Sequence, residues 1–159
     1  MVHDLALVHD SWKPIFHPLL ERIESIFSKI ADDAICPSRE NVFAAFRYPV
    51  DSIKVVIIGQ DPYPNASHAT GLAFSVASDV HSLPASLRNI FRELHTDLGT
   101  LLPMQGDLRR WSENGVLLLN RVLTTREGES NAHLSYGWQE ITDHICKVLG
   151  QKKVVAILW

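Results

Sequence analysis

The sequence predicts an α/β fold in which a central parallel sheet is flanked by helices. Three short apolar runs, rich in valine, isoleucine and leucine, have the composition of strands that are buried on both faces, which is typical of parallel sheets. Segments with helical periodicity separate these runs, and strands that alternate with helices favour parallel βαβ connections. The 159 residues suffice for one core, so we expect a single domain over residues 1–159.

Four segments carry the spacing of apolar residues that predicts amphipathic helices. These helices are expected over residues 13–30, 86–98, about 107–113 and 136–149. Pro18 falls early in the first segment, where a helix tolerates proline, or marks its true start. Asp107 is expected to cap the third helix, while Gly99 and Gly150 end the second and the fourth. The second helix should turn its apolar side chains, including Leu98, toward the core.

The buried strands are expected over residues 54–59, 116–119 and 154–158. A loop rich in Pro, Asn, Ser and Gly follows the first strand over residues 60–71. Residues 72–76 are expected to form a short extended segment. Residues 35–41 have the composition of a loop that leads to a short helix.

The composition is that of an ordinary globular protein, with 46% hydrophobic and 21% charged residues. No apolar run approaches the roughly 20 residues that a membrane-spanning helix needs. The N-terminal sequence MVHDLALVHDSW carries acidic residues and histidines where a signal peptide needs a basic start and an apolar stretch. We therefore expect a cytoplasmic protein with no membrane association.

The sequence indicates neither a disulfide bond nor a metal site. Cys36 and Cys146 lie far apart and outside any CxxC, so two free thiols, buried or half-buried, are expected. The histidines show no HExxH spacing, and no P-loop or GxGxxG pattern is present. We expect no metal and no cofactor.

The net charge of −3 disfavours a partner that is recognised through bulk positive charge. Residues 1–80 carry six basic and ten acidic side chains, whereas residues 81–159 carry nine and eight. The second half is therefore the better place for a surface that faces phosphate.

Polar residues follow two of the predicted strands directly. Gln60 and Asp61 follow the first strand, and Asn120 follows the second, so all three should lie at the carboxyl edge of the sheet, where open α/β sheets bind ligands. Asp61 precedes Pro62, which restricts its backbone and aims its carboxylate. An Asp-Pro turn and a turn-forming asparagine explain the same residues without any function. A phenylalanine such as Phe74 near this edge more often belongs to the core than forms a stacking platform.

An ordered set of motifs then resembles family 1 uracil-DNA glycosylases. The resemblance extends from Trp12 to Trp159 and includes ICPSRENVFAAF, GQDPYP, GLAFSV, LPASLRNIF, GVLLLNRVLT, NAHLSYGWQEIT and VVAILW. The combination of GQDPY, GLAFSV and LLLN is highly specific. The resemblance implies a DNA-repair hydrolase that flips uracil out of DNA, cleaves the N-glycosidic bond and leaves an abasic site.

The resemblance also implies roles for individual residues. Asp61 matches the catalytic aspartate, which orients water and stabilises positive charge on the sugar. Gln60 matches a residue that holds uracil through its backbone, and Tyr63 matches the tyrosine that excludes thymine at C5. Phe74 matches the ring that stacks on the base, and Asn120 matches the amide that reads its edge.

Pro84 and Ser86 match a loop that grips the DNA backbone without Lys or Arg. Ser75 and His133 also lie in matching motifs, although a structural histidine is equally compatible with His133. The implied partner is uracil-containing DNA, single- or double-stranded, and we expect a monomer. A phage-encoded DNA-mimic protein inhibits members of this family.

Two departures from the family pattern bear on activity. Pro64 replaces the histidine that most members carry at the end of GQDPYH. The family's HPSPLS motif, with its catalytic histidine and its apolar wedge, would follow Trp159. We therefore expect the domain to be C-terminally incomplete, without the last strand and its loop, and the loss of a donor to a developing anion costs about 10²–10³ in rate.

The sequence leaves two hypotheses. Either the chain excises uracil, or it is a truncated, catalytically impaired fragment that at most binds DNA or uracil weakly. A generic nucleotide-binding α/β module is disfavoured by the order of the motifs.

Overall fold

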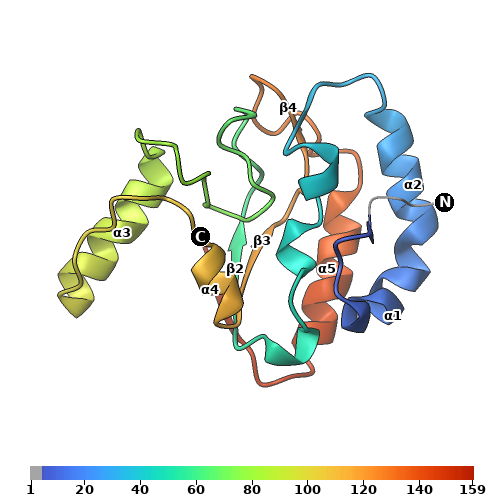
Figure 1. Cartoon of the computed structure of the whole chain (residues 1–159). Helices are drawn as coiled ribbons and strands as arrows, with labels where there is room; N and C mark the ends of the chain where they lie inside the picture. Colours follow the sequence, from blue (N-terminus) through green and yellow to red (C-terminus); the bar gives the residue numbers. More distant parts are fainter. Residues whose placement is uncertain (1–4) are drawn as a thin grey trace.

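The computed structural model describes residues 5–159 and contains a three-stranded parallel sheet in the order β3-β2-β5. The strands, including a separate antiparallel pair, are β1 (Ile35–Cys36), β2 (Val55–Gly59), β3 (Val116–Asn120), β4 (Thr125–Arg126) and β5 (Val155–Leu158). The α-helices are α1 (Lys13–Phe16), α2 (Leu20–Lys29), α3 (Ala85–Leu98), α4 (Arg109–Glu113) and α5 (Trp138–Leu149). In Figure 1, α2 and α5 lie to one side of β2 and β3, and α3 lies to the other. The predicted α/β class, with helices around a parallel sheet, is confirmed.

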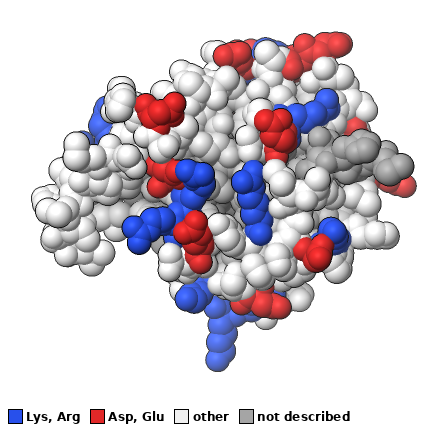
Figure 2. Space-filling view, viewed as in Figure 1, with Lys and Arg blue, Asp and Glu red and all other residues white. Residues whose placement is uncertain are grey.

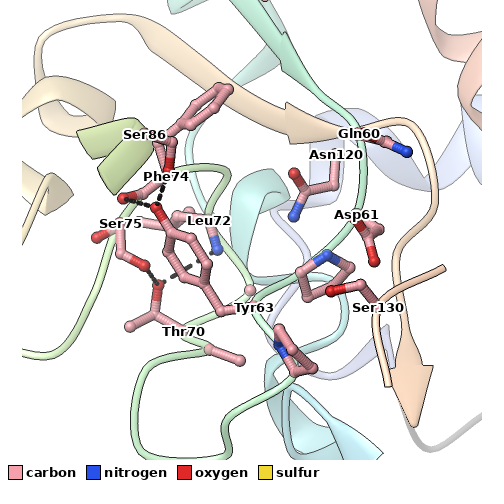
Figure 3. A pocket seen from close by; sticks show the side chains of 14 residues that line it. Gln60, Asp61, Tyr63, Thr70, Leu72, Phe74, Ser75, Ser86, Asn120 and Ser130 are labelled. Carbon is pink, nitrogen blue, oxygen red and sulfur yellow. Dashed lines mark hydrogen bonds between the residues drawn. The ribbon is translucent and has the colours of Figure 1, made fainter. Parts of the chain in front are cut away.

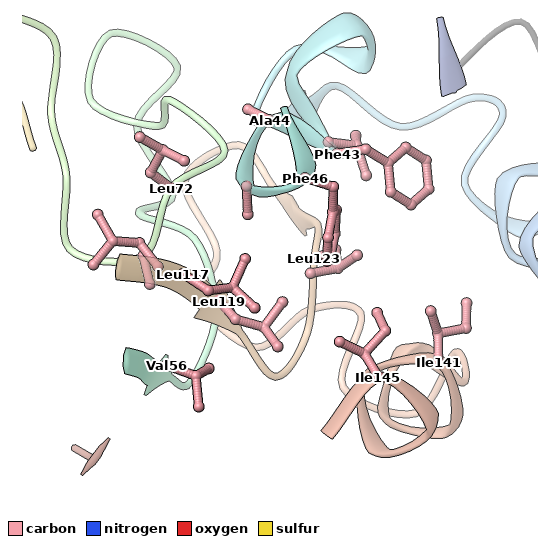
Figure 4. Packing of buried hydrophobic residues seen from close by; sticks show 14 of the residues in the cluster. Phe43, Ala44, Phe46, Val56, Leu72, Leu117, Leu119, Leu123, Ile141 and Ile145 are labelled. Carbon is pink, nitrogen blue, oxygen red and sulfur yellow. The ribbon is translucent and has the colours of Figure 1, made fainter. Parts of the chain in front are cut away.

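The core contains side chains from both sides of the sheet, including Leu87 and Phe91 of α3 and Ile141 and Ile145 of α5. Leu117 and Leu119 of β3 face the segment that carries Phe43 and Phe46, as the close view of the packing shows (Figure 4). Trp138, at the start of α5, is completely buried and meets the Phe43 ring at 6.1 Å. The continuous apolar run of β3 therefore has the predicted role of a strand buried on both faces.

The predicted first helix is divided at Pro18. The structure also contains five short 3₁₀ helices, which span Asp10–Trp12, His17–Leu19, Arg39–Asn41, Ala44–Phe46 and Val50–Ser52. The turn over His17–Leu19 separates α1 from α2, because proline has no N–H to continue the α-helical pattern.

Asp107 accepts a hydrogen bond at the start of α4, from the Arg109 N–H to its carboxylate at 3.0 Å. The N-cap position itself is occupied by Leu108, one residue later than predicted.

The extended segment predicted over residues 72–76 is wrong. This stretch is a turn in which Phe74 has a left-handed backbone, with φ of 65°. A single bond ties it to the sheet, from the Ala73 N–H to the Leu118 carbonyl at 3.1 Å. An isolated bond of this kind anchors a loop without extending the sheet.

The predicted burial of the last strand and of the end of α3 is also wrong. Val155 and Leu158 of β5 are 61% and 76% exposed, because β5 is the edge strand and no described element covers its outer surface. Leu98 is 64% exposed, since the end of α3 extends beyond the sheet (Figure 1). Gly99 ends this helix in the left-handed conformation, as predicted.

The charged side chains follow the balanced composition. In Figure 2, lysines and arginines alternate with acidic side chains on the face that is shown, without one large patch of a single sign. Within residues 5–159, no helix is both long and apolar enough to cross a membrane. The acidic start noted in the sequence includes residues 1–4, which lie outside the described residues. The two cysteines are free thiols, with Cys36 buried and Cys146 partly buried.

Candidate active site

The carboxyl ends of β2 and β3 meet side by side, as the sequence predicts. The two strands pair in parallel register, with Gly59 opposite Asn120. Two backbone bonds continue this pairing beyond the sheet, from the Arg121 N–H to the Gly59 carbonyl at 2.8 Å and from the Val122 N–H to the Gln60 carbonyl at 3.0 Å. The residues that leave the two strands are therefore fixed relative to one another.

A cavity of about 200 Å³ opens at this edge of the sheet. It is smaller than the roughly 300–1,000 Å³ of sites for drug-sized ligands, and so it suits a single small ring. Its walls are Gln60, Asp61, Pro62, Tyr63, Pro64, Ala69, Thr70, Gly71, Leu72, Phe74, Ser75, Ser86, Asn120 and Ser130. Figure 3 shows Asn120 and Asp61 on one side of the cavity and Tyr63, Phe74 and Ser86 on the other. A larger cavity near Ser112 adjoins this one and shares Ala69, Thr70 and Leu72 with it, and another lies near Trp111. The ends of β2 and β3 line neither of these larger cavities.

Asp61 presents a carboxylate that is anchored at one oxygen. Its Oδ2 atom accepts the backbone N–H of Asn131 at 2.7 Å. No described residue hydrogen-bonds Oδ1, so this oxygen is available to a ligand or a water molecule. The buried Pro62 follows and limits the movement of the backbone.

Gln60 reaches away from the cavity toward the same loop. Its Nε2 donates to Oδ1 of Asn131 at 2.8 Å, while its backbone carbonyl is occupied by Val122. No pattern in the sequence singles out Asn131, although it contacts both residues that follow β2. Asn131 has a φ of 63°, a left-handed conformation that asparagine tolerates better than most residues.

Asn120 is a largely buried residue whose amide group has unused hydrogen-bonding capacity on the cavity side. The residue is 6% exposed, and no described residue hydrogen-bonds its side chain. The amide group opens onto the cavity and is not sealed from solvent, so its donor and its acceptor are both available to a ligand with a matching edge. A Cβ atom at Gly59 would lie 2.7 Å from Asn120 Oδ1 and 3.2 Å from the Phe74 ring, so glycine at this position lets both side chains approach.

Phe74 and Tyr63 form the opposite wall. The left-handed backbone of Phe74 costs of order 1–3 kcal/mol, and strain of this kind is concentrated at functional sites. The Phe74 ring meets the Trp159 ring edge-to-face at 5.5 Å. The Tyr63 hydroxyl lies 3.2 Å from the Phe74 carbonyl and 3.0 Å from Ser86 Oγ. Burial raises the pKa of the Tyr63 phenol, so the phenol stays protonated at neutral pH.

Pro84 and Ser86 lie at the start of α3, as predicted. Pro84 is the N-cap residue, and the exposed Ser86 is the second residue of the helix. The unpaired backbone N–H groups and the dipole of a helix N-terminus favour an anion. Ser86 therefore lies both on the rim of the cavity and in the first turn of a helix, where the backbone favours negative charge.

The structure separates Ser75 from His133. Ser75 lines the cavity, but its buried Oγ accepts the Leu108 N–H at 3.0 Å and so fixes a neighbouring segment. His133 does not reach the cavity. It is fully buried, with its two ring nitrogens 2.9 Å from Thr124 Oγ1 and 3.0 Å from Asp33 Oδ2, which is the arrangement of a structural histidine.

Asp33 connects His133 to Arg126, and its carboxylate lies 3.1 Å from the Arg126 Nε atom. Hydrogen bonds from Arg126 and His133 hold the pKa of Asp33 below its usual value. This network anchors the loop after β4, which carries Asn131. No group of three potential metal ligands occurs within residues 5–159.

The family model of the Uracil DNA glycosylase superfamily matches residues 46–158. The chain belongs to this superfamily. Proteins named uracil-DNA glycosylase from Corynebacterium glutamicum and Mycolicibacterium vanbaalenii are 41% and 44% identical to it. Each match covers 96% of this chain and 71% of the relative. The family predicted from the motifs is thereby confirmed.

Solved glycosylase structures show the same fold. A crystal structure of a mimivirus UNG variant in complex with UGI matches with a TM-score of 0.87 at 28% identity and covers 96% of this chain. This chain spans 62% of that protein's length. The mimivirus uracil-DNA glycosylase itself matches with a TM-score of 0.75 at 26% identity and covers 98% of this chain.

Proposed function

We propose that this chain is a DNA-repair hydrolase that removes uracil from DNA. Uracil flips out of the helix into the cavity, water attacks the sugar C1′, and the bond from C1′ to the base breaks. The base leaves with the bonding electrons and takes up a proton, and an abasic site remains. Superfamily membership supports this proposal, and the observation that carries it is the Asn120 amide, which has no hydrogen-bond partner among the described residues and opens onto the cavity across from Tyr63 and Phe74.

Asp61 is the catalytic residue of this proposal. The bond from Asn131 fixes the carboxylate, and Oδ1 is available to orient the attacking water. The transition state resembles an oxocarbenium ion, so a fixed negative charge beside the sugar stabilises it. The position of Asp61 directly after a buried strand limits the reorganisation that this stabilisation requires.

Asn120, Phe74 and Tyr63 select the base. Uracil offers an N3–H donor and an O4 acceptor, which match the two ends of an amide, whereas cytosine offers the reverse pattern. The Phe74 ring stacks on the flipped base, and the Tyr63 ring occupies the space that a methyl group at C5 would need. The backbone of Gln60 helps to hold the uracil. Ser75 fixes the segment behind the base through its hydrogen bond with the Leu108 N–H.

Pro84 and Ser86 hold the DNA backbone. The Ser86 hydroxyl and the N–H groups at the start of α3 suit a phosphate, and neither requires a lysine or arginine. This arrangement accounts for DNA binding by a chain with a net charge of −3. We propose that the chain acts as a cytoplasmic monomer with one domain, and that a DNA-mimic inhibitor competes with DNA at this face.

A second candidate is a protein that binds uracil or DNA and performs little chemistry. No cationic side chain and no histidine lines the cavity within the described part of the chain. A departing uracil anion would then meet neutral donors only, and a missing donor costs about 10²–10³ in rate.

The release of uracil from a single-stranded uracil-containing oligonucleotide separates the two candidates. The chain should release uracil, and its Asp61→Asn variant should be slower by about 10²–10³ at unchanged thermal stability. If the folded chain binds the oligonucleotide but releases no uracil, the second candidate, a protein that only binds uracil or DNA, is correct. Equal rates for the two proteins would remove Asp61 from the mechanism.

A further inference from the structure

The Tyr63 hydroxyl links the base-binding wall of the cavity to the start of α3. Its oxygen lies 3.0 Å from Ser86 Oγ and 3.2 Å from the Phe74 carbonyl, and Figure 3 shows both contacts. A carbonyl can only accept, and a phenol has one hydrogen to donate. When Tyr63 donates to Phe74, Ser86 therefore donates to Tyr63, and the three groups form a directed chain of hydrogen bonds.

This chain fixes a ring that would otherwise be mobile. Tyr63 belongs to the loop after β2, whereas Ser86 belongs to α3, so their contact joins two separate elements. The ring is partly buried in the cavity wall, and its distance from the base decides how large a substituent at C5 can be. A hydroxyl held from two sides restricts the rotation of the ring about its side-chain bonds.

We propose that Ser86 is a positioning residue for base selection, which holds the Tyr63 ring in place and so makes the rejection of C5-substituted bases depend on Ser86. This inference rests on the proposed function, in which Tyr63 faces C5 of the base. Ser86 would then have two roles, one in binding a phosphate of the DNA backbone and one in positioning the Tyr63 ring inside the cavity.

The two roles of Ser86 compete for one hydroxyl hydrogen. A phosphate oxygen can only accept, so Ser86 must turn its hydrogen from Tyr63 to the phosphate when the backbone binds. Tyr63 then donates to Ser86 Oγ instead, and the Phe74 carbonyl loses this bond. Binding of a DNA phosphate at the start of α3 therefore changes the hydrogen bonds of Tyr63 and Phe74, which form the cavity wall that contacts the base.

A double-mutant cycle tests the proposal. Rates of base release are measured on single-stranded oligonucleotides that contain either uracil or 5-bromouracil, for wild type, Ser86→Ala, Tyr63→Phe and the double variant. The rate ratio of 5-bromouracil to uracil should rise about tenfold in each single variant and no further in the double variant. Ser86→Thr, which keeps the hydroxyl, should restore the wild-type ratio.

A different pattern would overturn the proposal. If Ser86 acts on phosphate alone, Ser86→Ala slows both substrates equally and leaves their ratio unchanged. Independent increases that multiply in the double variant would likewise show that the two hydroxyls do not act together.

A titration tests the same contact without catalysis. The hydrogen bond from Ser86 lowers the pKa of the Tyr63 phenol, against the upward effect of burial. The ultraviolet absorbance of tyrosinate should therefore rise at a higher pH in Ser86→Ala than in wild type, and Tyr63→Phe identifies the signal of this phenol. An unchanged titration would contradict the contact. A folded chain that shows the shift but releases no uracil would contradict the proposed function and leave the positioning contact intact.

Discussion

The backbone N–H of Asn131 lies 2.7 Å from Oδ2 of Asp61, and it joins two loops that are 70 residues apart in the sequence. The side chain of Asn131 binds Gln60 as well, at 2.8 Å. The network of Asp33, Arg126 and His133 holds the loop that carries Asn131. The position of the Asp61 carboxylate is therefore determined by residues that do not line the cavity.

The left-handed backbone of Asn131 predicts an asymmetry between two substitutions. Asn131→Ala should lower the free energy of unfolding by about 1–2 kcal/mol, because most residues with a Cβ atom are strained at this positive φ and alanine lacks the side-chain hydrogen bonds that help asparagine adopt it. Asn131→Gly should cost less, since glycine adopts the same φ without strain. Both variants lose the hydrogen bond to Gln60. The difference between their free energies of unfolding, measured in urea, therefore reports the backbone strain alone. Equal losses of stability would show that the side chain dominates.

The close approach over Gly59 predicts a defect in base binding. Gly59→Ala places a Cβ 2.7 Å from Asn120 Oδ1, so the amide or the Phe74 ring must move. We expect uracil release to fall by about tenfold or more, since positioning errors near 1 Å cost up to about 10² in rate. Gly150→Ala, at the end of α5, is the matched control and should leave the rate unchanged. A fully active Gly59→Ala variant would argue against the placement of the amide.

The unpartnered amide of Asn120 predicts a change of selectivity. Asn120→Asp replaces the donor of the amide with an acceptor, which suits the amino group of cytosine. Release of cytosine from a single-stranded oligonucleotide should become measurable, while release of uracil declines. Asn114→Asp, at an exposed helix end, serves as the control and should change neither rate. Selectivity that stays the same in Asn120→Asp would exclude recognition of the base edge by this side chain.

The Asp33 network predicts loss of stability in acid. Arg126, and to a lesser degree His133, lower the Asp33 pKa below its usual value of 3.8, so the native state binds this proton more weakly than the unfolded state does. The stabilisation is complete above the usual value and is lost as the pH falls through the lower native pKa. Asp33→Asn should reduce stability at neutral pH and flatten its dependence on pH in this acidic window. Parallel curves of unfolding free energy against pH would contradict this assignment.

The sequence predicted the elements whose signals are local. The apolar runs that became β2 and β3, the periodicity of α3 and α5 and the stop at Gly99 all depend on residues within one segment. It could not predict β4, because a two-residue strand is defined by its partner β1 and not by its own composition. The turn at Phe74 was missed for the same reason, since its partners lie on other segments.

The candidate site divides along the same line. The sequence by itself determined which residues follow the strands, since Asp61 and Asn120 are placed by the ends of β2 and β3. Only the tertiary structure decided that Asn131 holds Asp61, that Ser86 holds Tyr63 and that His133 lies outside the cavity. The physical reason is that strand periodicity is set by neighbouring residues, whereas a hydrogen bond between side chains depends on where distant segments meet in the folded chain.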